Sequence, residues 1–329
     1  GKTSSILNTE GDVVVLTGPG GDMADCFSYG NGSCAPFEPK APVALPSAPA
    51  GRRVPAGGEH SFRATGASPG EFVALNVTPV GATAAGFGTT HSSDDPAGPT
   101  SSVNFAPGTV DPNVSFSPVG SDRKLCFTNS THGPVHVVVD GMVVGVSTAF
   151  RSPSGSGAVR LADTRSGLGG GLIGPNERRC VGATGRSGEF TTLNVTPIGA
   201  GTPGFGTVHS SDTDAGATSN VNFGPGSVDP NLALAQIGSD GKVCFTNSEH
   251  GPVHLVLDQM VIADRGVFSQ PSADGAVRLA DTRSGHGGGR LGAKSTRGLA
   301  VVGAGAGDWV GLNVTPVGAS SPGFGTVHS

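Results

Sequence analysis

A six-residue stretch that occurs three times decides the fold: LNVTPV at 75–80, LNVTPI at 193–198 and LNVTPV at 312–317. Successive copies are 118 and then 119 residues apart. In each copy a GFGT motif follows, starting at residues 86, 204 and 323. A repeat of this length is one whole domain, because the units of solenoids and propellers are much shorter.

The agreement between copies extends on both sides of this stretch. The first two copies share SVNF and NVNF (102–105 and 220–223), LCFTNS and VCFTNS (125–130 and 243–248), and GPVHVVVD and GPVHLVLD (133–140 and 251–258). VRLADTRSG opens the second copy at 159–167 and the third at 277–285. Chance does not produce matches in this order and spacing, so the chain is a tandem array.

Each complete repeat is predicted to hold about eight short antiparallel strands. Several segments alternate apolar and polar residues with the period of two that half-buried strands require. Turn-forming residues such as GSDGK (238–242) separate them. This pattern predicts an all-β protein of tandem antiparallel β-sandwich, jelly-roll-like domains. In the second copy the expected strands are 158–165, 178–185, 191–199, 204–210, 219–224, 231–238, 242–248 and 253–262.

Composition excludes several other classes of protein. Gly 56 and Pro 25 together make about a quarter of the 329 residues, which leaves no room for long helices. No run of about 18 apolar residues is present, so we expect no membrane-spanning helix. A net charge of −5 with only five lysines offers no continuous basic surface, so nucleic acid is not an expected partner.

The repeats predict four segments, of which the outer two are incomplete. Residues 1–40 hold the closing strands of a preceding repeat and a cysteine-containing loop, 41–157 and 158–275 are complete sandwiches, and 276–329 are the first half of a third. The N-terminal GKTSSILNTEGDVVVLTG resembles GKVCFTNSEHGPVHLVLDQ (241–259), which closes the second copy. The first copy has VALPSAPAG (43–51) where the others have VRLADTRSG.

Half a sandwich leaves a sheet edge and an apolar face open. We therefore expect strands from elsewhere to complete residues 276–329. Three sources remain open: the rest of a longer protein, the chain's own N-terminal strands, or the N-terminal strands of a second copy.

Charge is unevenly distributed along the repeats. Residues 151–186 and 265–297 each carry a net charge of +4, whereas residues 187–264 carry −7. A basic first half would favour an acidic partner, and head-to-tail contacts that do not close produce filaments. The alternative is that the patches match only inside each sandwich.

The motifs VRLADTRSG, LNVTP, GFGTV, VNF, KVCFTNS and HLVLD together resemble a tandem repeat of secreted and cell-surface actinobacterial proteins. The resemblance covers about residues 40–329. It implies an extracellular or cell-surface β-rich module that often occurs in several copies. The short GYF-like stretch that usually ends that pattern is replaced here by GMVVGVSTAF (141–150) and QMVIADRGVF (259–268).

Two arginines and two histidines are the candidate ligand contacts. Arg165 and Arg283 follow an aspartate by two residues, where each either anchors a loop or binds an anion or a sugar. His91 and His209 each follow a GFGT motif and precede Ser-Ser-Asp. Neither serine of these loops lies on a GxSxG elbow, so we expect no catalytic residue and assign loop capping to the aspartate of each Ser-Ser-Asp.

Two groups of residues carry ligands of the kind that metals use. Asp212 and Asp214 offer two carboxylates for calcium, although the further ligands of a calcium loop are missing. His132 and His136, which recur in the second copy, precede an aspartate, but no cysteine or third histidine is near them in sequence. A strand histidine bonded to a backbone carbonyl is the default, so no metal and no cofactor are expected.

The five cysteines include no CxxC pair, which argues against a zinc ribbon. Cys26 and Cys34 are candidates for a local disulfide if the compartment is oxidising. Cys180 aligns with Phe62 and Leu299, an apolar position that favours a buried thiol. A Cys180–Cys244 disulfide is the alternative for this pair, and the first copy is not expected to form its equivalent.

Together these features predict a non-enzymatic extracellular structural or adhesive protein that self-assembles head to tail. Its expected partner is another copy of itself. A carbohydrate-binding surface module, with the arginines or histidines above as contacts, is the alternative, as is an accessory region of a secreted hydrolase. One Trp and one Tyr leave few rings for stacking on sugars, which weighs against the carbohydrate alternative.

Overall fold

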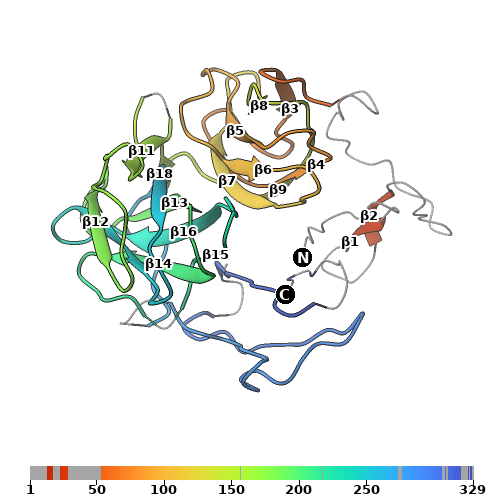
Figure 1. Cartoon of the computed structure of the whole chain (residues 1–329). Coiled ribbons are helices and arrows are strands. Elements are labelled where there is room, and N and C mark those ends of the chain that lie inside the picture. The colour runs from red at the N-terminus through yellow and green to blue at the C-terminus, as the bar shows by residue number, and fades with distance from the viewer. Residues whose placement is uncertain are drawn as a thin grey trace. The chain divides into compact units, whose positions relative to one another are not determined.

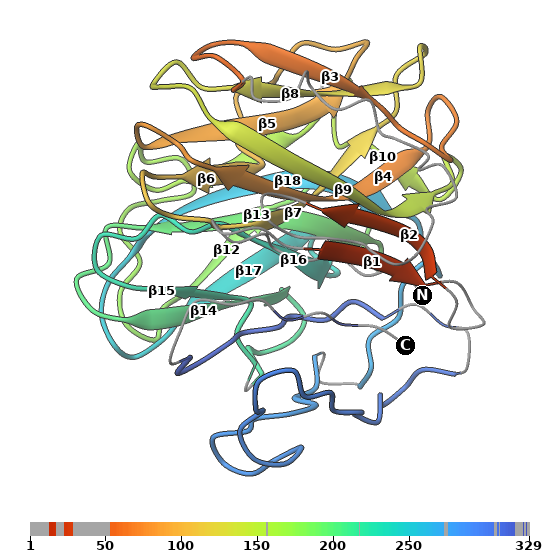
Figure 2. The same ribbon diagram turned by 90° about the vertical axis from the view of Figure 1, so that its right-hand side faces the viewer.

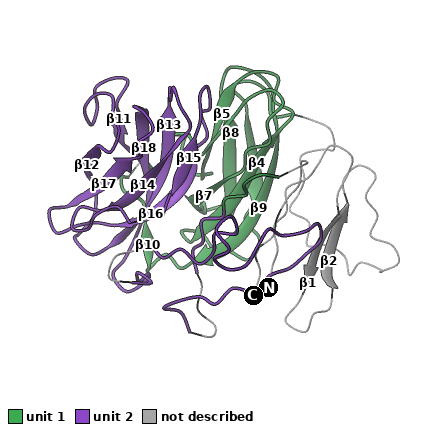
Figure 3. Ribbon diagram, turned by 60° about the horizontal axis from the view of Figure 1, so that its bottom comes forward, with its two compact units in different colours: residues 1–158, 315–329 green, residues 159–314 purple. Residues whose placement is uncertain are grey.

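The computed structural model describes residues 13–17, 23–28 and 53–319, with gaps at 156, 217, 273–275, 306–307 and 309, and also residues 325 and 327; for 13–17 and 23–28 it describes the backbone alone. Every regular element of these residues is a strand, as the sequence predicts. In this part of the chain there is no helix that could cross a membrane. The chain divides into two compact units, residues 1–158 with 315–329 and residues 159–314 (Figure 3).

The second unit contains eight strands, each overlapping a segment that the sequence predicts (Figure 1). One sheet has the order β12–β17–β14–β15; in the other, β18 lies between β11 and β13, and β16 pairs with the far side of β13. All pairs are antiparallel. The strands are β11 (Val159–Asp163), β12 (Arg178–Gly182), β13 (Phe190–Ile198), β14 (Gly204–Ser210), β15 (Val221–Phe223), β16 (Asn231–Gln236), β17 (Lys242–Asn247) and β18 (His254–Ala263).

The first unit repeats this arrangement. Its sheets have the orders β3–β8–β5–β6 and β7–β4–β9, and Figure 2 shows β3, β8 and β5 in one layer and β4 and β9 in the other. Two further strands, β1 (Val13–Thr17) and β2 (Met23–Ser28), form an antiparallel pair. The remaining strands are β3 (Glu59–Arg63), β4 (Phe72–Val80), β5 (Gly86–Ser92), β6 (Val103–Phe105), β7 (Asn113–Pro118), β8 (Lys124–Asn129), β9 (His136–Gly145) and β10 (Phe150–Arg151).

Each pair of sheets encloses one apolar core. In the second unit Leu193 and Val195 on β13 pack with Val243 and Phe245 on the other sheet. The glycine at the third position of GFGT makes room for this packing, because a Cβ at Gly206 would lie 2.2 Å from Cε2 of Phe245. The GFGT and CFTN motifs therefore recur together, because the phenylalanine of β17 packs directly against the backbone of β14 at the glycine.

The two halves of a repeat are interleaved in its sheets. In the second repeat, the first half supplies β11 to β14 and the second half supplies β15 to β18. β17 separates β12 from β14, and β18 separates β11 from β13. No strand of the first half pairs with another strand of that half. A first half alone therefore contains the sequences of four strands, but no two of these strands are neighbours in a sheet of the complete repeat.

The third repeat shows this consequence directly. Among the described residues of 276–319 there is no strand, although the segment repeats the sequences of β11, β12 and β13. Leu312 and Val314 of the third LNVTPV are 45% and 60% exposed, whereas Leu193 and Val195 of the second are completely buried. The same six-residue stretch thus forms a central strand in one repeat and an exposed segment in the other.

Substitution of Gly206 by alanine tests the packing that joins the two motifs. We expect Gly206→Ala to lower the free energy of unfolding of the second unit by about 1–3 kcal/mol, since the new methyl group overpacks Phe245. Gly224→Ala is the control, because a Cβ there meets nothing within 4 Å. Urea denaturation followed by circular dichroism measures both variants. Equal stability of the two variants would contradict this account of the motif.

Candidate functional site

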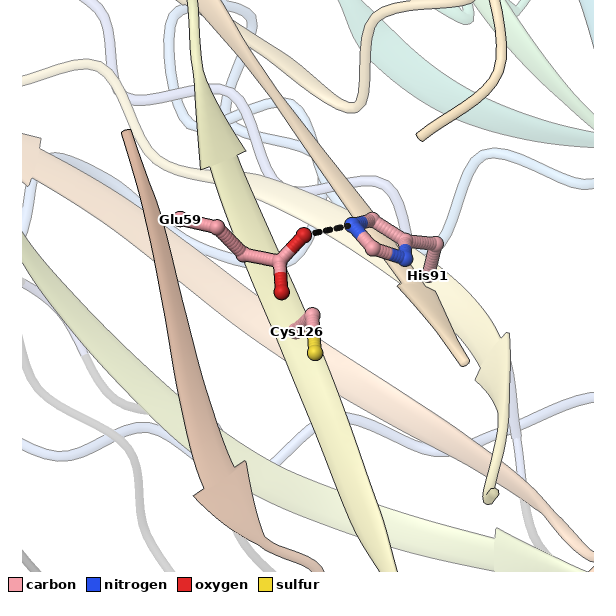
Figure 4. A group of neighbouring side chains, drawn as sticks. All are labelled: Glu59, His91 and Cys126. Atoms are coloured by element: carbon pink, nitrogen blue, oxygen red, sulfur yellow. Dashed lines mark ion pairs between the residues drawn. The ribbon is translucent and has the colours of Figure 1, made fainter. Parts of the chain in front are cut away.

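Three titratable side chains from three neighbouring strands meet on one face of the first sandwich (Figure 4). Glu59 lies on β3, Cys126 on β8 and His91 on β5. Their ligand atoms all lie within 4.8 Å of one another, and no other group of this kind occurs among the described residues. Leu125 and Phe127, on either side of Cys126, belong to the core, so the group lies on the face away from the core.

The strand register brings these residues together. Cys126 on the central strand β8 is the partner of Ser61 on β3 and of His91 on β5. Glu59 is the partner of Thr128, two residues further along β8 on the same face. The strands are not consecutive in the chain, so the group is created entirely by long-range pairing.

Hydrogen bonds orient the histidine. Its Nδ1 lies 2.8 Å from the carbonyl oxygen of Ser92, which can only accept, so we assign the proton of the neutral ring to Nδ1. In this tautomer Nε2 can accept a hydrogen bond from the Thr128 hydroxyl at 2.8 Å, whereas its 3.4 Å approach to the Glu59 carboxylate is an ion pair only when Nε2 also carries a proton. The Thr128 hydroxyl also lies within hydrogen-bond distance of Glu59, at 3.1 Å.

The thiol of Cys126 is buried and unreactive as it stands. Ser61 Oγ lies 3.0 Å from its sulfur. The pKa of the Cys126 thiol is raised, mainly because the thiol is buried. A thiol with a raised pKa is not an activated nucleophile, because the thiolate is the reactive form. The group therefore has the ligand atoms of a metal site, and it lacks the activated thiolate of a cysteine hydrolase.

The second repeat carries a disulfide at the same place. Cys244 on β17 is the register partner of Cys180 on β12, and the two are joined by a disulfide. His209 keeps the geometry of His91, with Nδ1 2.8 Å from the carbonyl of Ser210 and Nε2 2.9 Å from the Thr246 hydroxyl. Burial lowers the pKa of His209, which favours its neutral form.

The expected alignment of Cys180 with Phe62 is wrong by one residue, and so is the expectation of a buried Cys180 thiol. Cys180 pairs with Cys244 as Ser61 pairs with Cys126, so Ser61 is its counterpart. The cause is a difference in loop length: residues 64–71 separate β3 from β4, whereas residues 183–189 separate β12 from β13.

The expected alignment of the third repeat at this position is also wrong by one residue. Arg297 donates to the carbonyl groups of two glycines, as Arg179 does in the second repeat. Gly298 rather than Leu299 is therefore the counterpart of Cys180. Only the second repeat has cysteines at both positions.

The arginines expected to contact a ligand are bound to their own aspartates. Arg165 donates from Nε and Nη2 to both carboxylate oxygens of Asp163, at 2.9 and 2.7 Å. Arg283 makes the same pair of bonds to Asp281 at the same distances. These bonds hold the pKa of Asp163 below its ordinary value. The Asp–Arg pair of the DTR motif is thus closed within the turn, and it forms even in the third repeat.

The aspartates after the histidines join their own loop to the turn that precedes β8 or β17. Asp94 accepts hydrogen bonds from the backbone and hydroxyl of Ser121, both at 2.7 Å, and Asp212 accepts the equivalent pair from Ser239. Asp214 lies 3.5 Å from Arg178 with its side chain in solvent. The two calcium candidates, Asp212 and Asp214, therefore bind different partners.

The other expected ligand groups are also separated. His254 Nδ1 lies 3.0 Å from the hydroxyl of Thr164 and does not join Asp258 in a metal-binding group. Cys34 lies outside the described residues and the side chain of Cys26 is not described, so the local disulfide stays a prediction.

Asp140 and Asp258 occupy equivalent strand positions but differ in their partners. The fully buried Asp258 accepts hydrogen bonds from Nε and Nη2 of Arg160 at 2.8 and 3.0 Å. The first repeat has Ala44 in place of Arg160. Asp140 Oδ2 is buried without a hydrogen-bond partner in the described part of the chain, and burial raises the pKa of this carboxyl group.

Comparison with known proteins gives no assignment. No protein family, curated protein or solved structure matches the chain. The sequence predictions also missed the group of Glu59, His91 and Cys126. The one signal in the sequence was that Cys126 has no cysteine partner in its own repeat, because only the strand register shows that Glu59 takes the place of Arg178.

Neutralising the two equivalent aspartates is expected to have opposite effects. Asp258→Asn should lower the free energy of unfolding by about 1.5–3 kcal/mol, because it removes charged hydrogen bonds to Arg160. Asp140→Asn should raise stability at pH 7, since a carboxyl group with a raised folded-state pKa destabilises the fold when ionised. The gain should vanish as the pH falls to the ordinary value near 3.8. Denaturation from pH 3 to 8 measures both, and a pH-independent gain would contradict this explanation.

Removing the disulfide should destabilise the second unit alone. The bridge closes a separation of 64 residues, and its loss through the double substitution Cys180→Ser, Cys244→Ser should lower stability by about 2–4 kcal/mol. Differential scanning calorimetry with and without reductant measures the effect. Reductant should destabilise the wild type but not the double variant. An equal response of both proteins to reductant would contradict the assignment.

Proposed function

We propose that this protein is a non-enzymatic, extracellular structural or adhesive protein whose copies assemble head to tail by strand complementation. The observation that carries the proposal is the state of residues 276–319. This half repeat forms no strand among its described residues and leaves Leu312 and Val314 in solvent. Exposed apolar residues of a sandwich motif become buried only when other strands cover them, and this burial stabilises the fold.

The N-terminal segment has the sequence that the half repeat needs. Residues 1–18 resemble 241–259, which form β17 and the first part of β18. These are the two strands that pair with all four strands of the first half of the second repeat. Donation of this one segment would therefore supply both central partners. The strands still missing, equivalent to β15 and β16, are edge strands, and the sandwich tolerates their absence best.

A second copy is the favoured recipient of this segment. Among the described residues β1 pairs with β2 and 276–319 contain no strand, which favours a donor from another copy over the chain's own N-terminal segment. Exchange of β1 between copies places a donor at one end and an acceptor at the other. Such heterologous contacts extend into open chains of subunits.

The extracellular location is supported by two observations. The Cys180–Cys244 disulfide requires an oxidising compartment in most organisms. The motifs that resemble secreted and cell-surface actinobacterial repeats point to the same location. A glycan site at the arginines is not favoured, because Arg165 and Arg283 already use their paired donors on aspartates.

The proposal is tested by the assembly of the full chain. Sedimentation velocity over a concentration series, with negative-stain electron microscopy, should show species that grow with concentration. Deletion of residues 1–20 should leave a monomer, and a peptide of those residues should bind that monomer once. Leu312→Asp should weaken assembly, whereas Leu172→Asp, at an exposed leucine of the second repeat, should not. A full chain that stays monomeric at every concentration, or a deletion variant that assembles normally, would contradict the proposal.

A further inference from the structure

One position on the outer sheet face has the same strand partners in both sandwiches but carries different residues. In the second repeat Cys180 and Cys244 bridge β12 and β17. In the first repeat Ser61 replaces the first of these cysteines, and Cys126 keeps its thiol. The neighbouring position changes from Arg178 to Glu59, so a cation is replaced by a carboxylate. Loss of the disulfide is therefore accompanied by the gain of a ligand for a positive ion.

We propose that Glu59, His91 and Cys126 bind a zinc ion, which cross-links β3, β8 and β5 at the position where the second repeat has its disulfide. This inference does not depend on the proposed assembly. It assigns a metal site to residues that no sequence motif of the chain identifies.

The distances suit a tetrahedral ion. Bond lengths of about 2.0–2.3 Å to nitrogen, oxygen and sulfur place the ligand atoms of such a site roughly 3.3–3.7 Å apart. His91 Nε2 and Glu59 Oε2 are 3.4 Å apart, and all three ligand atoms lie within 4.8 Å of one another. Figure 4 shows the carboxylate directed at the imidazole, with the sulfur beside both.

The surrounding hydrogen bonds have the form that metal-binding histidines require. A ligating histidine usually donates its other ring N–H to a carbonyl or carboxylate, which fixes the tautomer. The Nδ1 of His91 does this to Ser92 at 2.8 Å, and the ion would take the place of the Thr128 hydroxyl that lies 2.8 Å from Nε2. The Ser61 hydroxyl, 3.0 Å from Sγ, can donate to the thiolate. Binding replaces the thiol proton of Cys126, which passes to solvent, and no electron is transferred.

The ligand set selects the metal. Thiolate and imidazole favour zinc and similar borderline ions over calcium and magnesium, which take oxygen ligands. Three protein ligands leave a fourth position for water, and the Glu59 side chain, 48% exposed, brings solvent to the site. The second repeat has the same histidine geometry at His209 but neither a carboxylate nor a free thiol, so it serves as an internal control.

The test uses the full chain, treated with chelator under nitrogen with its disulfide intact, and titrated with Zn²⁺ and with Co²⁺. One Zn²⁺ per chain should bind by calorimetry. Co²⁺ should give the near-ultraviolet charge-transfer band of a thiolate ligand. Zn²⁺ should also raise the unfolding temperature of the first unit. A correctly folded wild type that gives no thiolate band would overturn the proposal.

Four variants separate the site from adventitious binding. Cys126→Ser should abolish the band, and Glu59→Gln should weaken Zn²⁺ binding by about tenfold or more. Ser61→Cys places a cysteine opposite Cys126, and we expect the resulting disulfide to abolish binding while the fold, followed by circular dichroism, is retained. His209→Asn should leave the affinity unchanged. An unaltered stoichiometry and thiolate band in Cys126→Ser would show that the ion binds elsewhere and would overturn the assignment.

Discussion

The structure depends on one constraint: a strand from the first half of a repeat can pair only with strands from the second half. β17 and β18 each lie between two strands of the first half, and those strands never touch as neighbours in a sheet. Each sheet of a sandwich therefore needs strands from both halves of the repeat. This explains why identical LNVTPV sequences are mostly buried at Leu75–Val80 and exposed at Leu312–Val317. The strand exchange proposed above rests on the same constraint, since a donor of the two central strands would supply partners for both sheets.

Within this common fold, a few substitutions give the two complete repeats different chemistry. On the outer face of the second repeat a disulfide links two strands. On the outer face of the first repeat, a thiol, an imidazole and a carboxylate lie in the same place. Asp258 is neutralised by Arg160, whereas its counterpart Asp140 has no such partner among the described residues. Tandem copies tolerate such divergence, because each sandwich encloses its own core and a change on one outer face leaves the neighbouring core intact.

Much of the fold could be predicted from the sequence. The alternation of apolar and polar residues within a repeat of about 118 residues located all eight strands of the second copy, because sheet faces impose that period directly. The position of Cys180 could not be predicted, since one additional residue between β3 and β4 shifts the register without altering the alternation. Nor could the group of Glu59, His91 and Cys126, because β3, β8 and β5 become neighbours only through long-range pairing.

Hydrogen exchange measured by mass spectrometry tests the central claim most directly. The backbone amides of residues 312–317 are compared with those of the sequence-related 193–198 in dilute and in concentrated protein. We expect strong protection of 193–198 under both conditions, and protection of 312–317 only as the protein associates. Equal protection of the two stretches in a dilute, monodisperse monomer would contradict it, because the half repeat would then complete a sheet without strands from another copy.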